Sequence, residues 1–281
     1  MEKIKLVFRK TSYALFVALI VIAFANCSGG NKNETSEEAT AESMLDKSEV
    51  EKKVREVVYP LPTAFEVTEL INKVEASYII GITNELTNVD KYFTDKDQAL
   101  NLGVYSADLS YASTYNMQQE LMTYMEASEI LIKELGITGA FSRDFVENVE
   151  SNIDNKDKLV DLVTNSFYDT YEYLVINNKE DLSLLVLAGT WIEGMYISCN
   201  ITETVYNNPE LVKVILHQKG SLDKLIELLV PHNEHETIQA ILTDLQPIKL
   251  VYDSIDETGI TESQLKQIIE QASALRTKVV S

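Results

Sequence analysis

The residue pattern most suggestive of chemistry is the run 232–236 (HNEHE), in which two imidazoles lie three residues apart beside carboxylates. Imidazole nitrogens and carboxylate oxygens bind zinc, so His232, His235 and Glu236 are candidate metal ligands. The spacing is not that of HExxH, and His217 is not spaced to complete a set of three ligands. Because the run follows a proline, it also fits a loop and a helix start, where polar residues cap the backbone. We expect capping here rather than a bound metal.

A second candidate lies in residues 102–115 (LGVYSADLSYASTY), where one helical face carries a carboxylate among phenols. Asp108 lies at helical spacing from Tyr111 and Tyr115, and Tyr105 continues the same face. A buried aspartate in such surroundings is hydrogen-bonded or has a shifted pKa. A ligand-binding pocket and a hydrogen-bonded core cluster both fit this pattern. We favour the core cluster, because buried polar groups usually exist as hydrogen-bonded structure.

Two segments are rich in small residues, which let a neighbouring helix approach closely. Residues 188–196 (AGTWIEGMY) also contain the only tryptophan, Trp191, near Glu193. Trp191 and Glu193 are candidate ligand-binding residues, but tight helix packing is the simpler interpretation. Cys199, in the same apolar stretch, is predicted to be a buried thiol. The other segment, residues 102–115, has a stripe of small residues on the face next to Asp108: Gly103, Ala107, Ser110 and Thr114.

Motifs of several enzyme classes are absent from the sequence. There is no G-x-S-x-G, no phosphate-binding glycine loop, no C-x-x-C and no CxxCH haem signature. We therefore expect no cofactor and a protein that is not an enzyme; an enzyme built on the His/Glu or the Asp/Tyr cluster is the alternative. The net charge of −20 argues against a nucleic-acid partner, which would require clustered Lys and Arg. Two cysteines, one of them assigned to lipid below, exclude a disulfide framework.

The sequence beyond the N-terminus predicts an all-α fold, because apolar residues recur at i, i+3, i+4 and i+7 and no segment resembles a strand. The helix that begins with a capping box at Thr63–Glu66 should run to about Glu85, and Pro247 should kink or divide a helix at Thr237–Ile255. About eight to ten amphipathic helices should pack as antiparallel hairpins, in an irregular bundle or a solenoid-like array. Further starts are predicted at Thr94, Ser142, Asp154–Asp157, Asn208 and Thr261, and stops at Gly136, Asn177–Asn178, Gly220, Pro231 and Gly259.

The N-terminus has the layout of an export signal. Residues 1–10 are basic, and Tyr13–Ala25 is an uncharged apolar run that is too short for a comfortable membrane span. Cys27 follows almost directly, before Ser-Gly-Gly and a polar stretch. This layout resembles bacterial lipoprotein precursors, in which the cysteine after the apolar core is acylated and becomes the first residue of the mature chain. The resemblance implies a lipid anchor on Cys27.

The match to a lipoprotein cleavage site is partial, since Ala25 fits but Phe24 and Asn26 replace the usual aliphatic and small residues. Conventional cleavage after residues 23–25 (AFA) is the alternative, and it would release a soluble protein that starts at Asn26. We favour lipidation, because Cys27 stands at the correct distance from the apolar core. Two or more acyl chains would hold the mature protein stably on a membrane.

The chain is thus divided into a signal peptide (1–26), an acidic lipid-anchored tether with a short helical pattern near its end (27–58) and one helical domain (59–281). The first part of the tether is rich in Gly, Asn, Ser, Thr and Glu and has too few apolar residues to fold. Residues 1–26 carry a net charge of +3, so the remainder carries −23.

Several phrases between residues 59 and 200 resemble a family of helical lipoproteins of Bacteroidota to which no activity is assigned: YPLPTAFEVTELI, NVDKYFT, ALNLGVYSADLSYAS, NSFYDTYEYL and LAGTWIEGMYI. The resemblance implies a place in the cell envelope, and we expect the protein at the outer membrane, on its periplasmic or surface face. We therefore expect a membrane-tethered, extracytoplasmic binding or scaffold protein. Its partners would be the lipid membrane, through Cys27, and an envelope protein or a small ligand.

Overall fold

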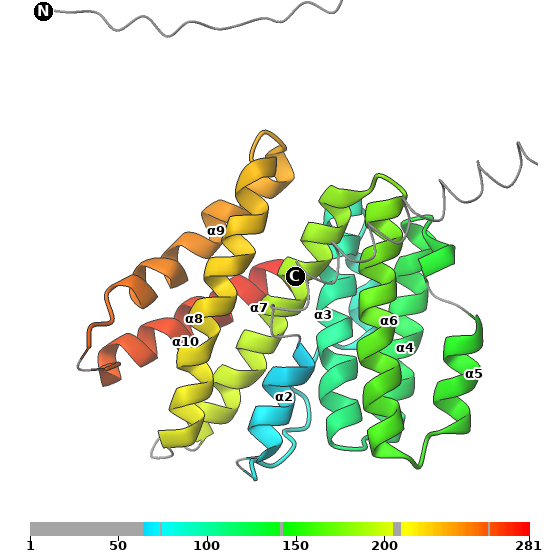
Figure 1. The fold of residues 1–281 in the computed structure, drawn as a ribbon, viewed down its shortest axis with the longest axis horizontal. Coiled ribbons are helices and arrows are strands. Elements are labelled where there is room, and N and C mark those ends of the chain that lie inside the picture. Colours follow the sequence, from blue (N-terminus) through cyan, green and yellow to red (C-terminus); the bar gives the residue numbers. More distant parts are fainter. Residues whose placement is uncertain (1–63, 74, 141–142, 205–208, 258) are drawn as a thin grey trace, which may run out of the picture. The chain divides into compact units, whose positions relative to one another are not determined.

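The fold is all-α in the part of the chain that the structure describes (Figure 1). The computed structural model describes residues 64–281 apart from residues 74, 141–142, 205–208 and 258, all within one compact unit, Met44–Ser281. These residues contain no β-strand, only an isolated bridge between Asp256 and Gly259, so the predicted fold class is confirmed. The α-helices are α2 (Ala64–Lys73), α3 (Asp95–Thr114), α4 (Gln118–Glu134), α5 (Arg143–Ser151), α6 (Lys156–Ile176), α7 (Glu180–Thr204), α8 (Pro209–Leu229), α9 (Glu236–Asp253) and α10 (Glu262–Val280). The short 3-10 helices are η1 (Leu86–Lys91), η2 (Thr138–Ala140) and η3 (Val230–His232).

Two buried helices, α3 and α7, cross with their backbones in contact. A Cβ atom on Gly103 would lie 2.0 Å from the carbonyl oxygen of Val186. A Cβ atom on Gly189 would lie 1.9 Å from the carbonyl oxygen of Leu100. The hydroxyl of Thr190 donates to the carbonyl of Gly103 at 3.1 Å across the same crossing. The small residues that the sequence placed in both segments therefore permit a close helix crossing, as predicted.

The other helices surround this pair as an irregular bundle (Figure 1). α2, α4 and α6 pack on α3, whereas α8 and α10 pack on α7. α9 packs on α8 and α10, and α5 packs on α6. In a solenoid each repeat contacts only its neighbours, but α3 and α7 are separated in the chain by three helices and still form the most extensive contact. The fold is therefore an irregular bundle.

The central helix α7 is apolar enough to resemble a membrane span. Its stretch Glu180–Ile201 is 22 residues long with a mean hydropathy of 1.4, and it is the one such helix among the described residues. However, 89% of its most apolar window is buried inside the protein. A helix that is apolar on all sides and covered by other helices is a core helix, so packing accounts for this composition.

Several helices begin with the caps that the sequence predicted. The side chain of Thr94 accepts a hydrogen bond from the backbone N–H of Asp97, and the side chain of Asn155 accepts one from Lys158. At the start of α10, Thr261 forms the reciprocal capping box with the glutamine three residues later. The other predicted starts depend on residues that lie outside the described part of the chain: Thr63, Ser142 and Asn208.

Four helices end in a residue with left-handed backbone, the arrangement of a Schellman cap. Gly136 and Asn178 confirm two of the predicted stops, with φ of 64° and 56°. The residue that follows each of them donates a backbone hydrogen bond to the last turn of the helix, from Ile137 to Ile132 and from Lys179 to Leu174. The predicted stop at Pro231 lies in η3, two residues after the end of α8, and the predicted stop at Gly259 lies six residues after the end of α9. The two caps that the sequence did not predict are Glu75 and Asn116.

Two predicted helix boundaries are wrong. The first helix ends at Lys73 rather than near Glu85, because the following residues are rich in β-branched side chains and include Gly81 with a φ of 84°. The predicted helix end at Gly220 is also wrong, since α8 continues through this residue. Gly220 is exposed, and the packing of the α8 residues before and after it outweighs the poor helix propensity of glycine. Pro247 lies inside α9 and does not divide it.

Candidate functional site

Residues 76–92, which we call the strap, follow α2 and run along α3. Apart from η1 the strap is not helical, so its buried backbone groups need other partners. Side chains from one polar face of α3 form hydrogen bonds with these backbone groups. Asp108, Tyr111 and Tyr115 therefore have hydrogen-bond partners within the chain, as the core-cluster interpretation predicts. The hydrogen bonds are Tyr115 Oη to Ala76 O (2.7 Å), Ile79 N to Tyr111 Oη (2.9 Å), Asn84 N to Asp108 Oδ2 (3.0 Å), Tyr105 Oη to Glu85 O (2.8 Å) and Gln98 Nε2 to Tyr92 O (3.1 Å).

Asp108 lies near a buried ion pair that the sequence did not predict. Arg276 of α10 binds both carboxylate oxygens of Glu193 in α7, with Nε–Oε2 at 3.0 Å and Nη2–Oε1 at 3.2 Å. Glu193 and Asp108 are both 0% exposed. Arg276 also donates to the carbonyl of Ile82 in the strap at 3.5 Å, and its guanidinium lies 4.7 Å from the centroid of the Tyr196 ring. These side chains link α3, α7, α10 and the strap.

Both buried carboxyl groups have a raised pKa. Burial raises the pKa of Asp108 well above its ordinary value, and the carboxylate of Glu193 raises it further. Burial also raises the pKa of Glu193, although Arg276 opposes this effect. Asp108 Oδ1 has no hydrogen-bond partner among the described residues, and a proton on Asp108 would allow it to donate to the Glu193 carboxylate. Because solvent reaches neither carboxyl, this cluster holds the fold together and does not offer a substrate site in this conformation.

Replacing Asp108 by asparagine should flatten the pH dependence of stability. The unfolded chain releases the protons of these two carboxyl groups above about pH 4, whereas the folded protein retains them to higher pH. The two protonated carboxyl groups therefore stabilise the fold at low pH, and this stabilisation is lost as pH rises through their raised pKa values. Each such proton contributes up to about 1.4 kcal/mol per pH unit. Asp108→Asn keeps the hydrogen-bonding shape and should become the more stable protein at alkaline pH. Urea unfolding from pH 5 to 9 measures this.

The matched control is Asp161→Asn, which removes an exposed carboxylate from α6. It should retain the pH dependence of the wild type. Equal slopes for the wild type and Asp108→Asn would contradict the raised pKa of Asp108 in the folded protein.

Tyr111 and Tyr115 also form an aromatic cluster with Tyr78 of the strap. The rings of Tyr78 and Tyr111 are stacked with centroids 4.6 Å apart, and Tyr115 lies 5.5 Å from Tyr78 and 5.1 Å from Tyr111. Burial raises the pKa of Tyr115 to about 12. The cluster fixes the start of the strap on the C-terminal end of α3.

Trp191 and Cys199 lie in the main hydrophobic core of the described residues. Trp191 is 7% exposed, and its indole N–H has no hydrogen-bond partner within the described part of the chain. The thiol of Cys199 is buried, as predicted. Trp191 therefore packs as a core residue, whereas its sequence neighbour Glu193 joins the ion pair.

The two histidines of residues 232–236 meet an acid from another helix. Nδ1 of His232 lies 3.3 Å from Asp181 at the start of α7, and Nδ1 of His235 lies 3.1 Å from the other oxygen of that carboxylate. His235 occupies the N-cap position of α9 but makes no capping hydrogen bond, so that expectation is wrong for this side chain. Glu236 begins α9 and is exposed. His217 lies twelve residues before the end of α8, about 18 Å along its axis.

No group of three or more His, Cys, Asp or Glu has metal-binding geometry within the described residues. The metal hypothesis required such a convergence of ligands from separate elements. Asp181 was not among the residues singled out in the sequence, because it lies 51 positions before His232 and 54 before His235.

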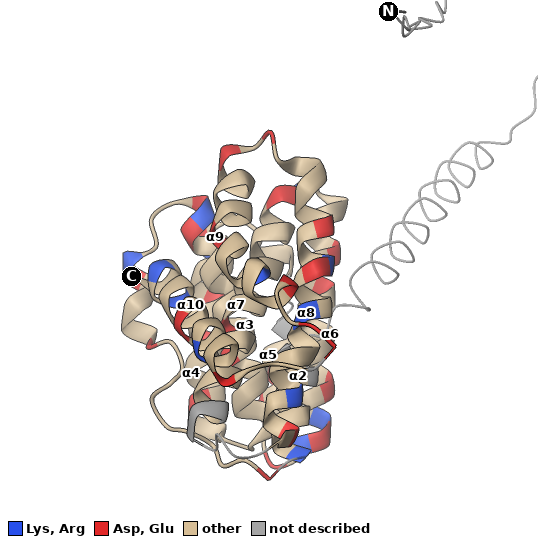
Figure 2. Cartoon of the chain, turned by 90° about the vertical axis from the view of Figure 1, so that its left-hand side faces the viewer, with Lys and Arg blue, Asp and Glu red and all other residues tan. Residues whose placement is uncertain are grey.

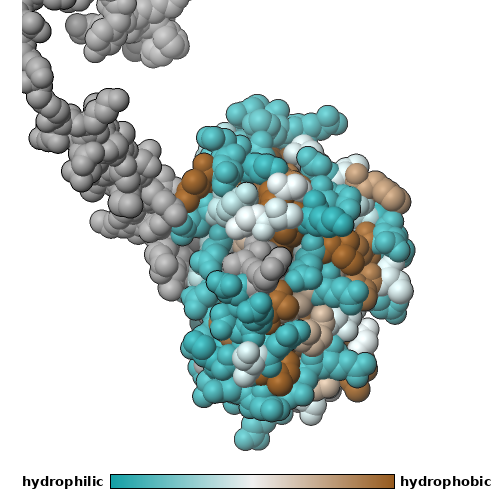
Figure 3. Space-filling model, turned by 90° about the vertical axis from the view of Figure 1, so that its right-hand side faces the viewer, coloured by the Kyte–Doolittle hydropathy of each residue, from teal (hydrophilic) through white to brown (hydrophobic). Residues whose placement is uncertain are grey.

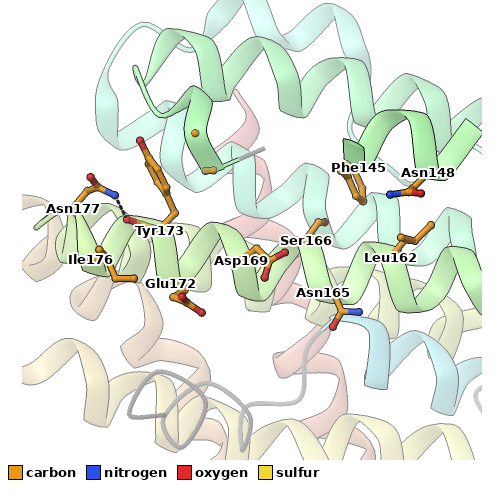
Figure 4. A pocket seen from close by; sticks show the side chains of 12 residues that line it. Phe145, Asn148, Leu162, Asn165, Ser166, Asp169, Glu172, Tyr173, Ile176 and Asn177 are labelled. Carbon is orange, nitrogen blue, oxygen red and sulfur yellow. Dashed lines mark hydrogen bonds between the residues drawn. The ribbon is translucent and has the colours of Figure 1, made fainter. Parts of the chain in front are cut away.

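A pocket that the sequence did not predict lies between α5 and α6. It has a volume of about 520 Å³, within the range of about 300–1,000 Å³ typical of small-molecule sites. η2 and α5 form one wall, and one face of α6 from Leu162 to Asn177 forms the other. Figure 4 shows Phe145 and Leu162 at one end of this α5–α6 groove and Tyr173 with Asn177 at the other. Fifteen residues of helix make the groove about 22 Å long.

The α5–α6 groove is lined by a mixture of neutral polar, acidic and apolar residues. Asn148, Asn165 and Asn177 contribute amides, and Tyr173 contributes a ring. No Lys or Arg belongs to the groove lining in the described residues. Figure 3, which looks at the side where α5 lies in Figure 1, shows hydrophobic residues exposed between hydrophilic ones. In the sequence, this polar face of α6 resembles an ordinary solvated face, so only the placement of α5 reveals the groove.

Comparison with protein-family models, with curated proteins and with solved structures gave no match to this chain. The candidate site therefore depends on its own geometry. The α5–α6 groove is open to a ligand, whereas the Asp108–Glu193–Arg276 cluster is closed.

Proposed function

We propose that the chain is a lipid-anchored protein of the cell envelope and that its helical body is a binding module. The α5–α6 groove is the observation that carries the binding function, because it combines sufficient volume, several hydrogen-bonding side chains and an aromatic ring. The candidate residues found in the sequence support a structural role instead, since the Asp108 and Glu193 carboxyls are buried. A binding protein is therefore better supported than an enzyme.

The proposed location rests on the N-terminal sequence. A basic segment, a short apolar core and Cys27 in succession support export and acylation, and the polar residues after Cys27 would separate the helical body from the membrane. We propose the outer membrane, on its periplasmic or surface face. Figure 2 shows acidic and basic residues interspersed on the side formed by α8, α9 and α10, which does not favour a nucleic-acid partner.

Replacing Cys27 by serine should release the protein from membranes, because serine cannot form the thioether on which the anchor depends. The wild type should sediment with the membrane fraction and enter the detergent phase on Triton X-114 partitioning, whereas Cys27→Ser should leave both. The matched control is Cys199→Ala, which changes the buried cysteine of α7 and should keep the wild-type distribution. A Cys27→Ser protein that stays in the detergent phase as fully as the wild type would contradict the lipid anchor.

A further inference from the structure

We propose that α5 is the movable wall of the α5–α6 groove: it detaches from α6 while the rest of the fold stays intact. This inference rests on the proposed function, since it describes how a ligand would enter the groove. Local opening of this kind is common in native proteins, whose parts differ in stability. The length of α5, its partner, the space beside it and the turn after it all support such an opening.

α5 is the shortest α-helix in the part of the chain that the structure describes. It has nine residues, Arg143–Ser151. Isolated helices shorter than about 12–15 residues are marginal in water, because the unfavourable first turn is followed by too few favourable residues. α5 therefore keeps its helical structure only while its apolar face is packed on the rest of the protein.

The packing of α5 depends on one neighbouring helix among those described. That helix is α6, and Figure 1 shows α5 at the outer edge of the bundle. α2 is only one residue longer, but it packs on α3, α7 and α8. Loss of one contact therefore releases α5, whereas α2 would have to leave three helices at once.

Few apolar side chains attach α5 to the core. Phe145 is 7% exposed, Val149 is 0% exposed, and Val146 is partly buried beside them. Five other residues of α5 are exposed: Asp144, Glu147, Asn148, Glu150 and Ser151. Hydrophobic stabilisation is roughly proportional to the apolar area removed from water. Detachment of α5 should therefore require much less free energy than unfolding of the whole domain.

The α5–α6 groove makes the contact between the two helices incomplete. Phe145 and Asn148 line the groove on α5, and Leu162 and Asn165 line it on α6 (Figure 4). Atoms beside such a space of about 520 Å³ lack the packing contacts that a close-packed interface provides. A ligand that touched both helices would supply such contacts and hold α5 in place.

The turn after α5 is fixed to the rest of the protein. Gln118 of α4 donates to the carbonyl of Ile153 at 3.1 Å and to the carboxylate of Asp154 at 2.9 Å. The side chain of Asn155 accepts from the backbone N–H of Lys158 and so caps α6. The opening should therefore stop at this turn and leave α6 folded.

The inference is tested by the rate at which buried thiols of the full-length protein react with iodoacetamide under native conditions. Val149→Cys places a thiol in α5, and the matched control Val163→Cys places one in α6; both valines are buried. The native Cys199, buried in α7, is the reference in both proteins. Peptide mass spectrometry separates the thiols, and rates in concentrated urea correct for intrinsic reactivity.

The thiol of Val149→Cys should react at least about 100-fold faster than the thiol of Val163→Cys and than Cys199. Urea below the unfolding midpoint should hardly change the fast rate, because sensitivity to denaturant scales with the surface that an opening exposes. The rate for Val163→Cys should rise steeply with urea, since that thiol reacts only after the whole domain unfolds.

Equal rates for the two introduced thiols would overturn the inference, because α5 and α6 would then open together. Amide hydrogen exchange of the unaltered protein makes the same test without a substitution. Residues 147–151 should exchange about 100-fold faster than residues 163–174, and equal protection would contradict a separate opening of α5. Neither experiment contains a ligand, so a failure here would leave the proposed binding function standing.

Discussion

Replacing Gly189 by alanine is expected to destabilise the protein by about 3 kcal/mol or more, at the upper end of the range for overpacked cores. The added methyl would lie 1.9 Å from the carbonyl oxygen of Leu100, and a backbone atom inside a buried helix cannot move aside as a side chain can. Gly103→Ala should act similarly, because its methyl would meet the backbone of Val186 at 2.0 Å. Urea denaturation followed by circular dichroism measures both free energies of unfolding.

Gly220 provides the matched control, since it lies in helix α8 and a Cβ atom there meets nothing within 4 Å. Gly220→Ala should raise the free energy of unfolding by about 0.5–1 kcal/mol, because alanine has the higher helix propensity. If Gly189→Ala were as stable as the wild type, α3 and α7 could not approach as closely as described.

Replacing Arg276 by methionine is expected to reduce the free energy of unfolding by about 3–5 kcal/mol. The methionine fills a similar volume but leaves Glu193, which is 0% exposed, without its bidentate partner. An unpaired buried carboxylate must be protonated or remain poorly solvated, and either change costs free energy. The strap also loses the hydrogen bond to Ile82 O.

A double variant separates the charge effect from packing. Glu193→Gln combined with Arg276→Met removes both charges and should recover a large part of the loss, because uncharged groups can replace a buried ion pair. Lys266→Met in the same helix removes an exposed pair with Glu262 and should change stability by less than about 1 kcal/mol. An Arg276→Met protein as stable as Lys266→Met would show that Glu193 does not depend on this partner.

The parts of the fold that depend on local pattern could be predicted from the sequence. Helix caps such as Thr94 and Thr261 form hydrogen bonds with residues three positions later in the sequence. The small residues around Gly103 and Gly189 indicate close packing against another helix, even when the sequence does not show which helix that is. The polar face around Asp108 was also predicted to be a hydrogen-bonded core cluster. Each of these signals lies within a few turns of one helix.

Features that depend on distant residues could not be predicted. Arg276 and Glu193 are 83 positions apart, and neither residue type indicates the other. Residues 76–85 of the strap were predicted to be helical, because no local pattern reveals that their backbone groups bind side chains of α3. The α5–α6 groove exists only because α5 lies beside a polar face of α6.

The central claim, a helical binding module tethered by lipid, is tested most directly by the intact mass of the mature protein extracted from membranes. The account predicts a polypeptide that begins at Cys27 and carries the additional mass of two or more acyl chains. A polypeptide that begins at Asn26 without lipid would contradict it.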